Sequence, residues 1–251
     1  QCTASSYTMR ELGVPFAGLF GACSTMAEGL ALGAALCEGG AARNLLAMAS
    51  SHFCAAERQF RTPLSYGAVR TPTAQWTATA AGCCLLQPQG EGVGIAAATF
   101  GRVQDYQVKD INNMGAAMAP AAASTLLHYF KDTGTEPQEF DCIYTGDLGQ
   151  VGSQLLRELL AAEGLLIKNH VDCGCILFDA NEQSVKSGGS GPGCCAAVLC
   201  GHILPRLRRG SQKRVLFTAT GALMSQTTFL QKETIPAVAH LVELRAPEKE
   251  K

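Results

Sequence analysis

The sequence predicts an α/β protein built from two related halves. Strand-like and helix-like segments alternate along most of the 251 residues, as they do where crossover helices join parallel strands. A hydrophobic content of 47% can fill a large core. A short amphipathic helix, a small-residue loop, a long Ala/Gly-rich helix and a basic turn before a strand occur twice in the same order. We therefore expect halves at 1–104 and 105–251 that pack about a pseudo-twofold axis, with their long helices starting near the interface.

Apolar periodicity predicts five helices, several of them closed by glycine, which readily adopts the left-handed conformation that ends a helix. The predicted helices are Ser5–Leu12, Ser24–Gly40, Gly115–Asp132, Ser153–Glu163 and Cys194–Arg209, with closing glycines at Gly13, Gly134, Gly164 and Gly210. The chain begins at Gln1 with a helix already under way. Compared with the second half, the first half lacks an initial strand, helix and strand, so we expect an N-terminally truncated fold.

Apolar runs bounded by turn residues predict eight strands. They are Pro15–Phe20, Asn44–Ala49, Thr77–Leu86, Gly94–Val103, Asp141–Thr145, Val171–Leu177, Val215–Ala219 and Ala237–Leu244. A Gln/Pro/Gly turn separates Thr77–Leu86 from Gly94–Val103. We therefore expect these two strands to pair as an antiparallel hairpin.

Charge and composition exclude several classes of function. The formal net charge is -1 with both signs dispersed, so there is no basic surface for a nucleic acid. No apolar stretch approaches the ~20 residues of a membrane-spanning helix, and no signal peptide is evident. The twelve cysteines include no CxxC pair, so we interpret them as reduced thiols of an intracellular protein. The best metal candidate, His170 with Cys173 and Cys175, has weak ligand spacing, and we predict no metal site.

Cys23 is the most informative single residue. It lies between the apolar run Phe16–Phe20 and the helix predicted from Ser24, so it would occupy the first turn of that helix. Unpaired N–H groups and the helix dipole at this position favour a thiolate and bind anions. Cys23 is therefore a candidate nucleophile. The alternative is a small buried cysteine without chemistry.

A thiol nucleophile needs a base to deprotonate it and donors for an oxyanion. Of the five histidines, His52 and His170 each lie at a strand end that could face the interface of the two halves, which suits a base for Cys23. A purely structural role for both imidazoles is the alternative. His128, His202 and His240 fall within helices or strands and have no partner close in the sequence.

Seven segments carry a resemblance to a known family. They are FAGLFGACST, SSHFCAAERQFRTP, MGAAMAPAAA, YTGDLGQVGS, DCG, GGSGPGCCAAV and TATGAL, spread from Phe16 to Leu223. Together they resemble the thiolase-like superfamily, in which a cysteine opens the long helix of the first half. Within that superfamily they are similar to the stage V sporulation protein AD family of endospore formers.

The resemblance implies a five-layered α-β-α-β-α fold and a homodimer. It also implies binding of pyridine-2,6-dicarboxylate (dipicolinic acid) for uptake into the developing spore. The implied partners are membrane proteins of the stage V sporulation A operon, and the implied location is peripheral to the inner membrane of the forespore.

Matched to condensing enzymes of this fold, the chain lacks both basic partners of the cysteine. Asp147 stands after the strand where a histidine is expected, and the loop Gly188–Gly193 holds neither histidine nor asparagine. A carboxylate near Cys23 would raise the thiol pKa. We therefore expect a non-catalytic binding protein in which Cys23 is a vestigial nucleophile. The alternatives are an active acyltransferase or 3-ketoacyl synthase that uses Cys23 with His52 or His170, and a structural subunit with a vestigial pocket.

The expected ligand site combines a cysteine, basic side chains, carboxylates and a glycine-rich loop: Cys23, His52, Arg58, Arg61, Asp147, His170, Asp172, Ser190 and Gly191. Backbone N–H groups at the starts of the two long helices suit a small dianion. Arginines pair with carboxylates through two parallel hydrogen bonds, and Arg70 follows the first two along the chain. Ion pairs at a surface or an interface, with Glu57 available as a partner, are the alternative for these arginines.

Asp147 and Asp172 need a separate explanation, because carboxylates repel a dianion unless a cation bridges them. Calcium accompanying dipicolinate is one explanation, since this ion prefers oxygen ligands. The explanation that we prefer is that each aspartate caps a helix or accepts backbone hydrogens in its turn.

Overall fold

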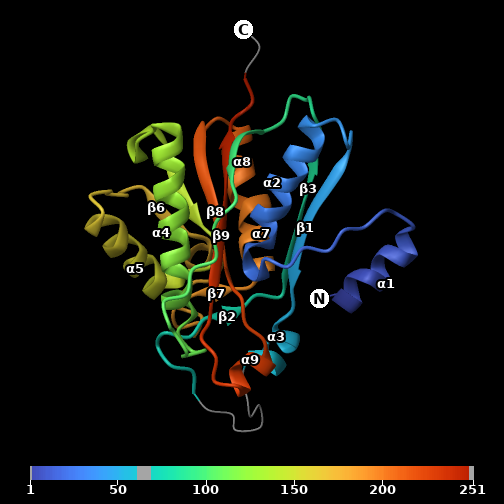
Figure 1. Ribbon diagram of the computed structural model, residues 1–251. Helices are drawn as coiled ribbons and strands as arrows, with labels where there is room; N and C mark the ends of the chain where they lie inside the picture. The colour runs from blue at the N-terminus through green and yellow to red at the C-terminus, as the bar shows by residue number, and fades with distance from the viewer. Residues whose placement is uncertain (1, 61–68, 249–251) are drawn as a thin grey trace.

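The computed structural model describes residues 2–60 and 69–248, which fold into layers of helices and sheets (Figure 1). The helices are α1 (Cys2–Leu12), α2 (Thr25–Glu38), α3 (Phe53–Phe60), α4 (Met114–Thr133), α5 (Gly149–Ala162), α6 (Cys173–Leu177), α7 (Pro192–Val198), α8 (Leu204–Arg208) and α9 (Gln226–Leu230). The strands are β1 (Leu45–Ser51), β2 (Trp76–Thr77), β3 (Ala80–Leu86), β4 (Gly94–Thr99), β5 (Cys142–Thr145), β6 (His170–Asp172), β7 (Gly189–Ser190), β8 (Arg214–Ala222) and β9 (Ala237–Arg245).

A mixed five-stranded sheet forms the centre of the molecule. Its order is β4-β9-β8-β5-β6, with β5 parallel to β6 and β8, and β9 antiparallel to β8 and β4. Residues alternate between the two faces of the sheet, and both faces are buried. On β8, Leu216 packs with α4 and α5, whereas its neighbours Val215 and Phe217 pack with α2 and α7. The sheet thus separates two hydrophobic cores.

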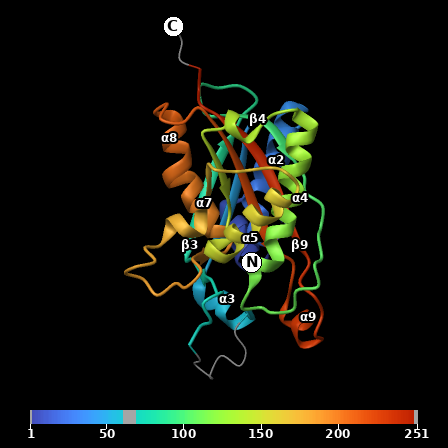
Figure 2. The ribbon, with the colours of Figure 1, turned by 90° about the vertical axis from the view of Figure 1, so that its left-hand side faces the viewer.

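A second layer of strands lies beyond α2 and α7 (Figures 1 and 2). β1 and β3 pair antiparallel along their full lengths, and Ala47 and Ala49 face the core that contains α2. On the opposite face of this pair, Leu46 and Leu85 are each 58% exposed. Two-residue β2 and β7 form a short parallel pair that holds the loop before α7. Figure 1 shows α1 standing apart, beyond β1.

The helices predicted from sequence are present, with ends that shift by a few residues. Gly13, Gly134, Gly164 and Gly210 all adopt the left-handed conformation, with φ between 63° and 81°. The predicted Cys194–Arg209 helix runs from Pro192 through α7, a π-helical turn η4 (Leu199–Ile203) and α8. Helices α3, α6 and α9 were not predicted. No helix in the described part of the chain combines the length and the apolar character needed to cross a bilayer.

Two strand predictions and one predicted pairing are wrong. Pro15–Phe20 is an irregular segment with Phe20 81% exposed, because no described strand pairs with it. The expected hairpin does not form: β3 pairs with β1, and β4 pairs with β9, where Ile95 and Ala97 of β4 reach the two cores. The apolar burial gained when β3 and β4 pair with distant strands therefore outweighs the tendency of the turn to form a hairpin. The strand predicted to continue to Leu177 ends at Asp172, which caps α6.

Candidate functional site

Cys23 lies in a tight turn immediately before α2. The 3-10 turn η1 (Ala22–Ser24) precedes the helix, and Ala22 has a φ of 51°, a left-handed value that costs an alanine free energy. The Ser24 hydroxyl donates to the Gly21 carbonyl at 2.6 Å, and the Gly21 N–H donates to Glu28 of α2 at 3.0 Å. These bonds hold the backbone in the bent form that presents Cys23.

Strand β8 of the central sheet packs against this turn. Gly221 of β8 leaves no space for a side chain, since a Cβ there would lie 2.1 Å from the Gly21 carbonyl oxygen. From the other side, the Cys195 thiol of α7 donates to the Cys23 carbonyl at 3.6 Å. The starts of α2 and α7 therefore meet, as the sequence predicted.

Asp147 is a fully buried carboxylate beside Cys23. One oxygen accepts a hydrogen from the Thr220 hydroxyl of β8 at 2.9 Å. The other accepts from the Ser190 hydroxyl at 2.9 Å and the Gly191 N–H at 3.1 Å. The structure thus brings four of the predicted site residues, Cys23, Asp147, Ser190 and Gly191, into one cluster.

The environment of Cys23 disfavours its thiolate. Burial raises the pKa of the thiol well above its usual value, and the charge of Asp147 and a hydrogen bond with it raise it further. The Gly191 N–H opposes this rise only weakly. The electrostatic benefit of the helix start is therefore outweighed, and the sequence prediction of a raised thiol pKa is confirmed.

The loop before α7 uses its backbone donors internally. The Gly191 N–H bonds Asp147, the Gly193 N–H donates to the Ser51 hydroxyl at 3.0 Å, and the Cys194 N–H donates to the Gly191 carbonyl at 2.9 Å. Gly191 has a φ of 99°, a conformation that is strained for any other residue. The expectation that this loop offers free N–H groups to an anion is wrong for these three donors, because Asp147, Ser51 and the Gly191 carbonyl already accept their hydrogens.

Asp172 is held by four donors from the protein. Its Oδ1 atom accepts the N–H groups of Gly149 and Gly174, both at 2.9 Å. Its Oδ2 atom accepts the Leu148 N–H at 2.9 Å and the Thr145 hydroxyl at 2.6 Å. Burial and repulsion from Asp147 raise the pKa of Asp172 to about 7, while these donors oppose the rise. Asp172 therefore caps α6 and the turn before α5. Both of its oxygens, which calcium would need as ligands, already accept hydrogen bonds from the protein.

His170 belongs to the same network but does not contact Cys23. Its Nε2 atom lies 2.8 Å from the Thr145 hydroxyl oxygen. Thr145 donates its only hydroxyl proton to Asp172. The Nε2 atom of His170 must therefore carry a hydrogen and donate it to the Thr145 hydroxyl oxygen. Burial, with repulsion from Arg157, lowers the pKa of His170 to about 4. The imidazole is thus neutral and contacts a threonine, which is a structural environment.

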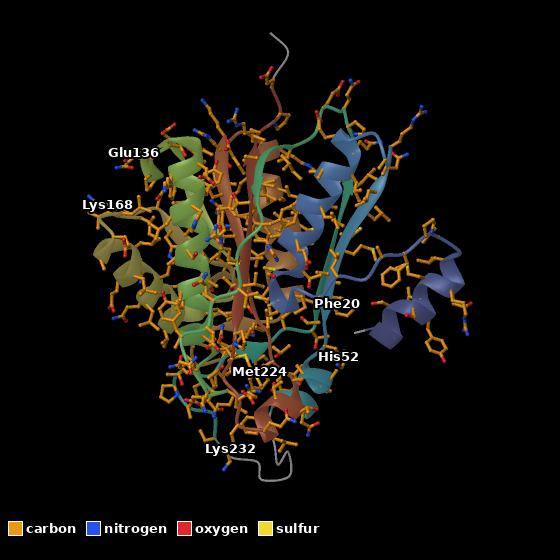
Figure 3. All side chains as sticks on the ribbon, viewed as in Figure 1. Phe20, His52, Glu136, Lys168, Met224 and Lys232 are labelled. Carbon is orange, nitrogen blue, oxygen red and sulfur yellow. The ribbon has the colours of Figure 1, made fainter. Side chains whose placement is uncertain are left out.

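The remaining predicted residues do not join the cluster in the described part of the chain. The side chain of His52 is exposed where α3 begins (Figure 3), although the neighbouring Ser51 contacts the 188–193 loop. Arg58 lies in α3, but its side chain is outside the described residues, as is all of Arg61.

Arg70 forms a packed cluster next to the 188–193 loop. Its guanidinium pairs with Glu57 of α3, donates to the Gln75 carbonyl at 2.8 Å, and lies 4.4 Å from the centre of the Trp76 ring. Trp76 in turn stacks on Phe53 and is paired with Gly189 through β2 and β7. This cluster therefore connects α3 to the 188–193 loop, which donates hydrogen bonds to Asp147.

Sequence reasoning missed three residues of the site. Thr145 links Asp172 to His170, Thr220 bonds Asp147, and the Gln75 amide donates to the Asp147 carbonyl. Thr220 falls in the TATGAL segment, so the resemblance had marked its neighbourhood. Gln75 carried no such signal, because its contact spans 72 positions of the sequence.

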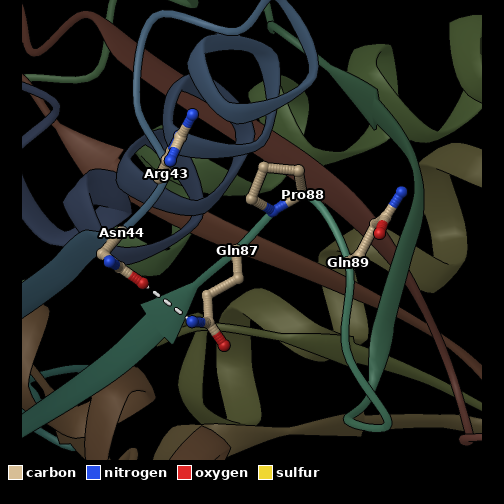
Figure 4. A pocket seen from close by; sticks show the side chains of 5 residues that line it. All are labelled: Arg43, Asn44, Gln87, Pro88 and Gln89. Atoms are coloured by element: carbon tan, nitrogen blue, oxygen red, sulfur yellow. Dashed lines mark hydrogen bonds between the residues drawn. The ribbon is translucent and has the colours of Figure 1, made fainter.

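Among the described residues, no group of three histidine, cysteine, aspartate or glutamate side chains is arranged to hold a metal ion. His170, Cys173 and Cys175 therefore do not form a metal site. Two surface hollows are present elsewhere. One, of about 390 Å³, lies between Arg43, Asn44 and residues 87–89 (Figure 4), and the other, of about 290 Å³, lies beside Phe140 and Lys168. Neither is lined by Cys23 or Asp147.

Comparison with known proteins identifies both a family and a fold. The family model for Stage V sporulation protein AD matches residues 1–245. The chain is 43% identical over 241 residues to Stage V sporulation protein AD of Bacillus subtilis (strain 168), covering 96% of this chain and 71% of that protein.

Solved condensing enzymes show the fold. The tetronic acid condensing enzyme AbyA1 aligns with a TM-score of 0.60 and 14% identity, over 96% of this chain and 72% of its own. The 3-oxoacyl-[acyl-carrier-protein] synthase III of Aquifex aeolicus VF5 aligns with a TM-score of 0.57 and 14% identity, over 97% of this chain and 71% of its own. The thiolase-like α/β fold predicted from the sequence is confirmed.

Proposed function

The chain belongs to the stage V sporulation protein AD family, and we propose that it is a non-catalytic binding protein on a thiolase-like scaffold. Its ligand is dipicolinic acid, which it binds for uptake into the developing spore. The family places the protein in sporulation. The identity of the ligand comes from the sequence resemblance, and the site geometry supports a binding role over catalysis.

The observation that carries this proposal is the carboxylate of Asp147 beside Cys23. A condensing or thiolytic enzyme needs a base that takes the thiol proton and donors that stabilise an oxyanion. Asp147 instead raises the pKa of Cys23, and its oxygens accept hydrogens from Thr220, Ser190 and Gly191. These hydroxyl and N–H groups are therefore not free to stabilise an oxyanion.

Neither histidine that could replace the base is placed to do so. His170 bonds Thr145, and His52 is exposed at the start of α3. An acyltransferase that uses Cys23 with either imidazole would need one of them to move. Two observations favour this alternative: the chain has a cysteine at the start of α2, and its fold is that of condensing enzymes.

We place the dicarboxylate on the side of the 188–193 loop where α3 begins. Arg70 lies in this region, but Glu57 and the Trp76 ring already occupy its guanidinium. Arg58 and Arg61 are therefore proposed as the groups that pair with the two carboxylates, on the chemistry of their side chains and their place in the sequence.

Calorimetric titration with dipicolinate tests the proposal. Arg58→Ala and Arg61→Ala are each expected to weaken binding at least tenfold, or about 1.4 kcal/mol. Arg43→Ala is the matched control, since Arg43 precedes β1 at the end opposite α3 and its loss should leave affinity unchanged. Unchanged affinity in a folded arginine variant removes that residue from the site. Absence of any binding in the unaltered protein refutes the ligand.

The same proposal extends to assembly and location. We propose a homodimer that lies against the inner membrane of the forespore, in contact with membrane proteins of the stage V sporulation A operon. Light scattering tests the dimer, and a mass that corresponds to one chain would contradict it. Calcium is proposed only as an ion that accompanies dipicolinate, because Asp147 and Asp172 are bonded to protein donors.

A further inference from the structure

Cys84 of β3 and Cys200 of the π-helical turn face each other across two layers of the fold. Their sulfur atoms are 3.9 Å apart, and the Cys200 thiol also donates to the Cys83 carbonyl at 3.7 Å. Both cysteines are free and partly exposed. The contact joins residues 116 positions apart, so it is a product of the fold and not of local sequence.

The backbone fixes this approach. At Gly82, two residues before Cys84 on the same face of β3, a Cβ would lie 2.5 Å from the carbonyl oxygen of Ala196. Only glycine lets the helix press this closely on the strand. Ala196 and Cys200 lie one turn apart, and Cys200 sits within the π-helical turn, an irregularity that often marks a functional position.

The two thiols are unequal. The hydrogen bond from Cys84 and the charge of Arg208 lower the pKa of Cys200, while burial opposes this shift. The pKa of Cys84 is raised far above its usual value by the hydrogen bond to Cys200 and by burial. A cysteine with a lowered pKa that is accessible and next to a second thiol has the features of an oxidation-sensitive pair.

We propose that Cys84 and Cys200 form a reversible disulfide when the protein meets a hydroperoxide, with Cys200 attacking first and Cys84 resolving. The Cys200 sulfur attacks one peroxide oxygen, the O–O bond breaks, and Cys200 becomes a sulfenic acid while the other oxygen leaves as water. The Cys84 sulfur then attacks the sulfenic sulfur, the S–O bond breaks, and a second water leaves with the proton of Cys84. Two thiols are oxidised and one hydrogen peroxide is reduced to two waters. This proposal does not rest on dipicolinate binding.

The sulfur atoms need to approach by roughly 2 Å to reach bonding distance. The bond would tie β3 to the helix that starts at the 188–193 loop, and it would close a large loop of the chain. The oxidised protein is therefore expected to unfold at a temperature roughly 5–15 °C above that of the reduced protein.

The test treats the full chain with equimolar hydrogen peroxide, blocks remaining thiols by alkylation and maps disulfides by mass spectrometry. One tryptic peptide, 71–102, holds both Cys83 and Cys84, and another, 187–206, holds Cys194, Cys195 and Cys200. Single variants are therefore needed to assign the bond. Cys83→Ser is the matched control, because Cys83 is the neighbour of Cys84 on the exposed face of β3.

We expect the linked peptides in the unaltered protein and in Cys83→Ser, their loss in Cys84→Ser and Cys200→Ser, and reversal by dithiothreitol. In Cys84→Ser, a cyclic dicarbonyl probe is expected to trap sulfenic acid on Cys200. Linkage that persists in Cys200→Ser, or that disappears in Cys83→Ser, overturns the assignment. In the unaltered protein, iodoacetamide should modify Cys200 faster than the exposed Cys54 and Cys175. Slower modification overturns the role of Cys200 even if a variant fails to fold.

Discussion

Replacement of His170 by glutamine tests the buried network through the pH dependence of stability. The imidazole has a pKa of about 4 in the folded protein, against 6.5 for an unperturbed histidine. Between pH 4 and pH 6.5, His170 is protonated in the unfolded chain but stays neutral in the folded protein. Stability therefore falls as the pH falls, and the contribution lost from about pH 7 to pH 4 is about 3 kcal/mol.

Glutamine removes this titration while its amide can still donate to the Thr145 hydroxyl, which His170 contacts at 2.8 Å. Asp172 acts with the opposite sign, because its pKa is raised to about 7 and the folded protein holds its proton more tightly than the unfolded chain does. Its contribution is present in both proteins. The difference between them therefore isolates His170.

The assay is urea unfolding of both proteins at about pH 7 and about pH 4.5. Acidification is expected to destabilise the unaltered protein more than His170→Gln, by about 2–3 kcal/mol. His128→Gln is the matched control, since His128 is exposed on α4 and bonds only the Ser124 carbonyl in the same helix. Parallel loss of stability in the unaltered protein and His170→Gln would refute the neutral buried imidazole.

Two further predictions concern the Cys23 turn. Asp147→Asn removes the carboxyl group whose charge and hydrogen bond both raise the pKa of Cys23, so iodoacetamide should alkylate Cys23 faster at about pH 8; an unchanged rate would show that Asp147 does not control the thiol. Gly221→Ala should destabilise the protein by about 3 kcal/mol in thermal unfolding, because its Cβ would lie 2.1 Å from the Gly21 carbonyl oxygen. Gly201→Ala is its control, with no atom within 4 Å of the new Cβ, and equal losses in both variants would contradict the packing argument.

The parts of the fold that the sequence predicted well depend on local chemistry. Glycines such as Gly134 and Gly210 end helices because of their own conformational freedom. The start of α2 and the position of Cys23 were also predictable, since a small-residue turn precedes a long Ala/Gly-rich helix. Asp147 could be placed near Cys23 only through the resemblance, which supplied the order of the elements.

The failures involve contacts between distant residues. Thr77–Leu86 and Gly94–Val103 have a suitable turn between them, yet β4 pairs with β9, about 140 residues further along. Asp172 ends a strand that apolar content alone extends to Leu177, because its carboxylate caps α6. The use of the 188–193 donors by Asp147 and Ser51 could not be predicted either. Hydrogen-bond competition is visible only when the three segments are placed together.

The central claim is that this scaffold binds a dicarboxylate and does not transfer acyl groups through Cys23. The direct measurement is a side-by-side experiment on one preparation: calorimetric titration with dipicolinate, and intact-mass analysis after incubation with an acyl-CoA. We predict saturable heat with dipicolinate and an unmodified protein mass with the acyl-CoA. An acyl adduct that disappears in Cys23→Ala, together with no dipicolinate heat, would contradict the claim and favour an active acyltransferase.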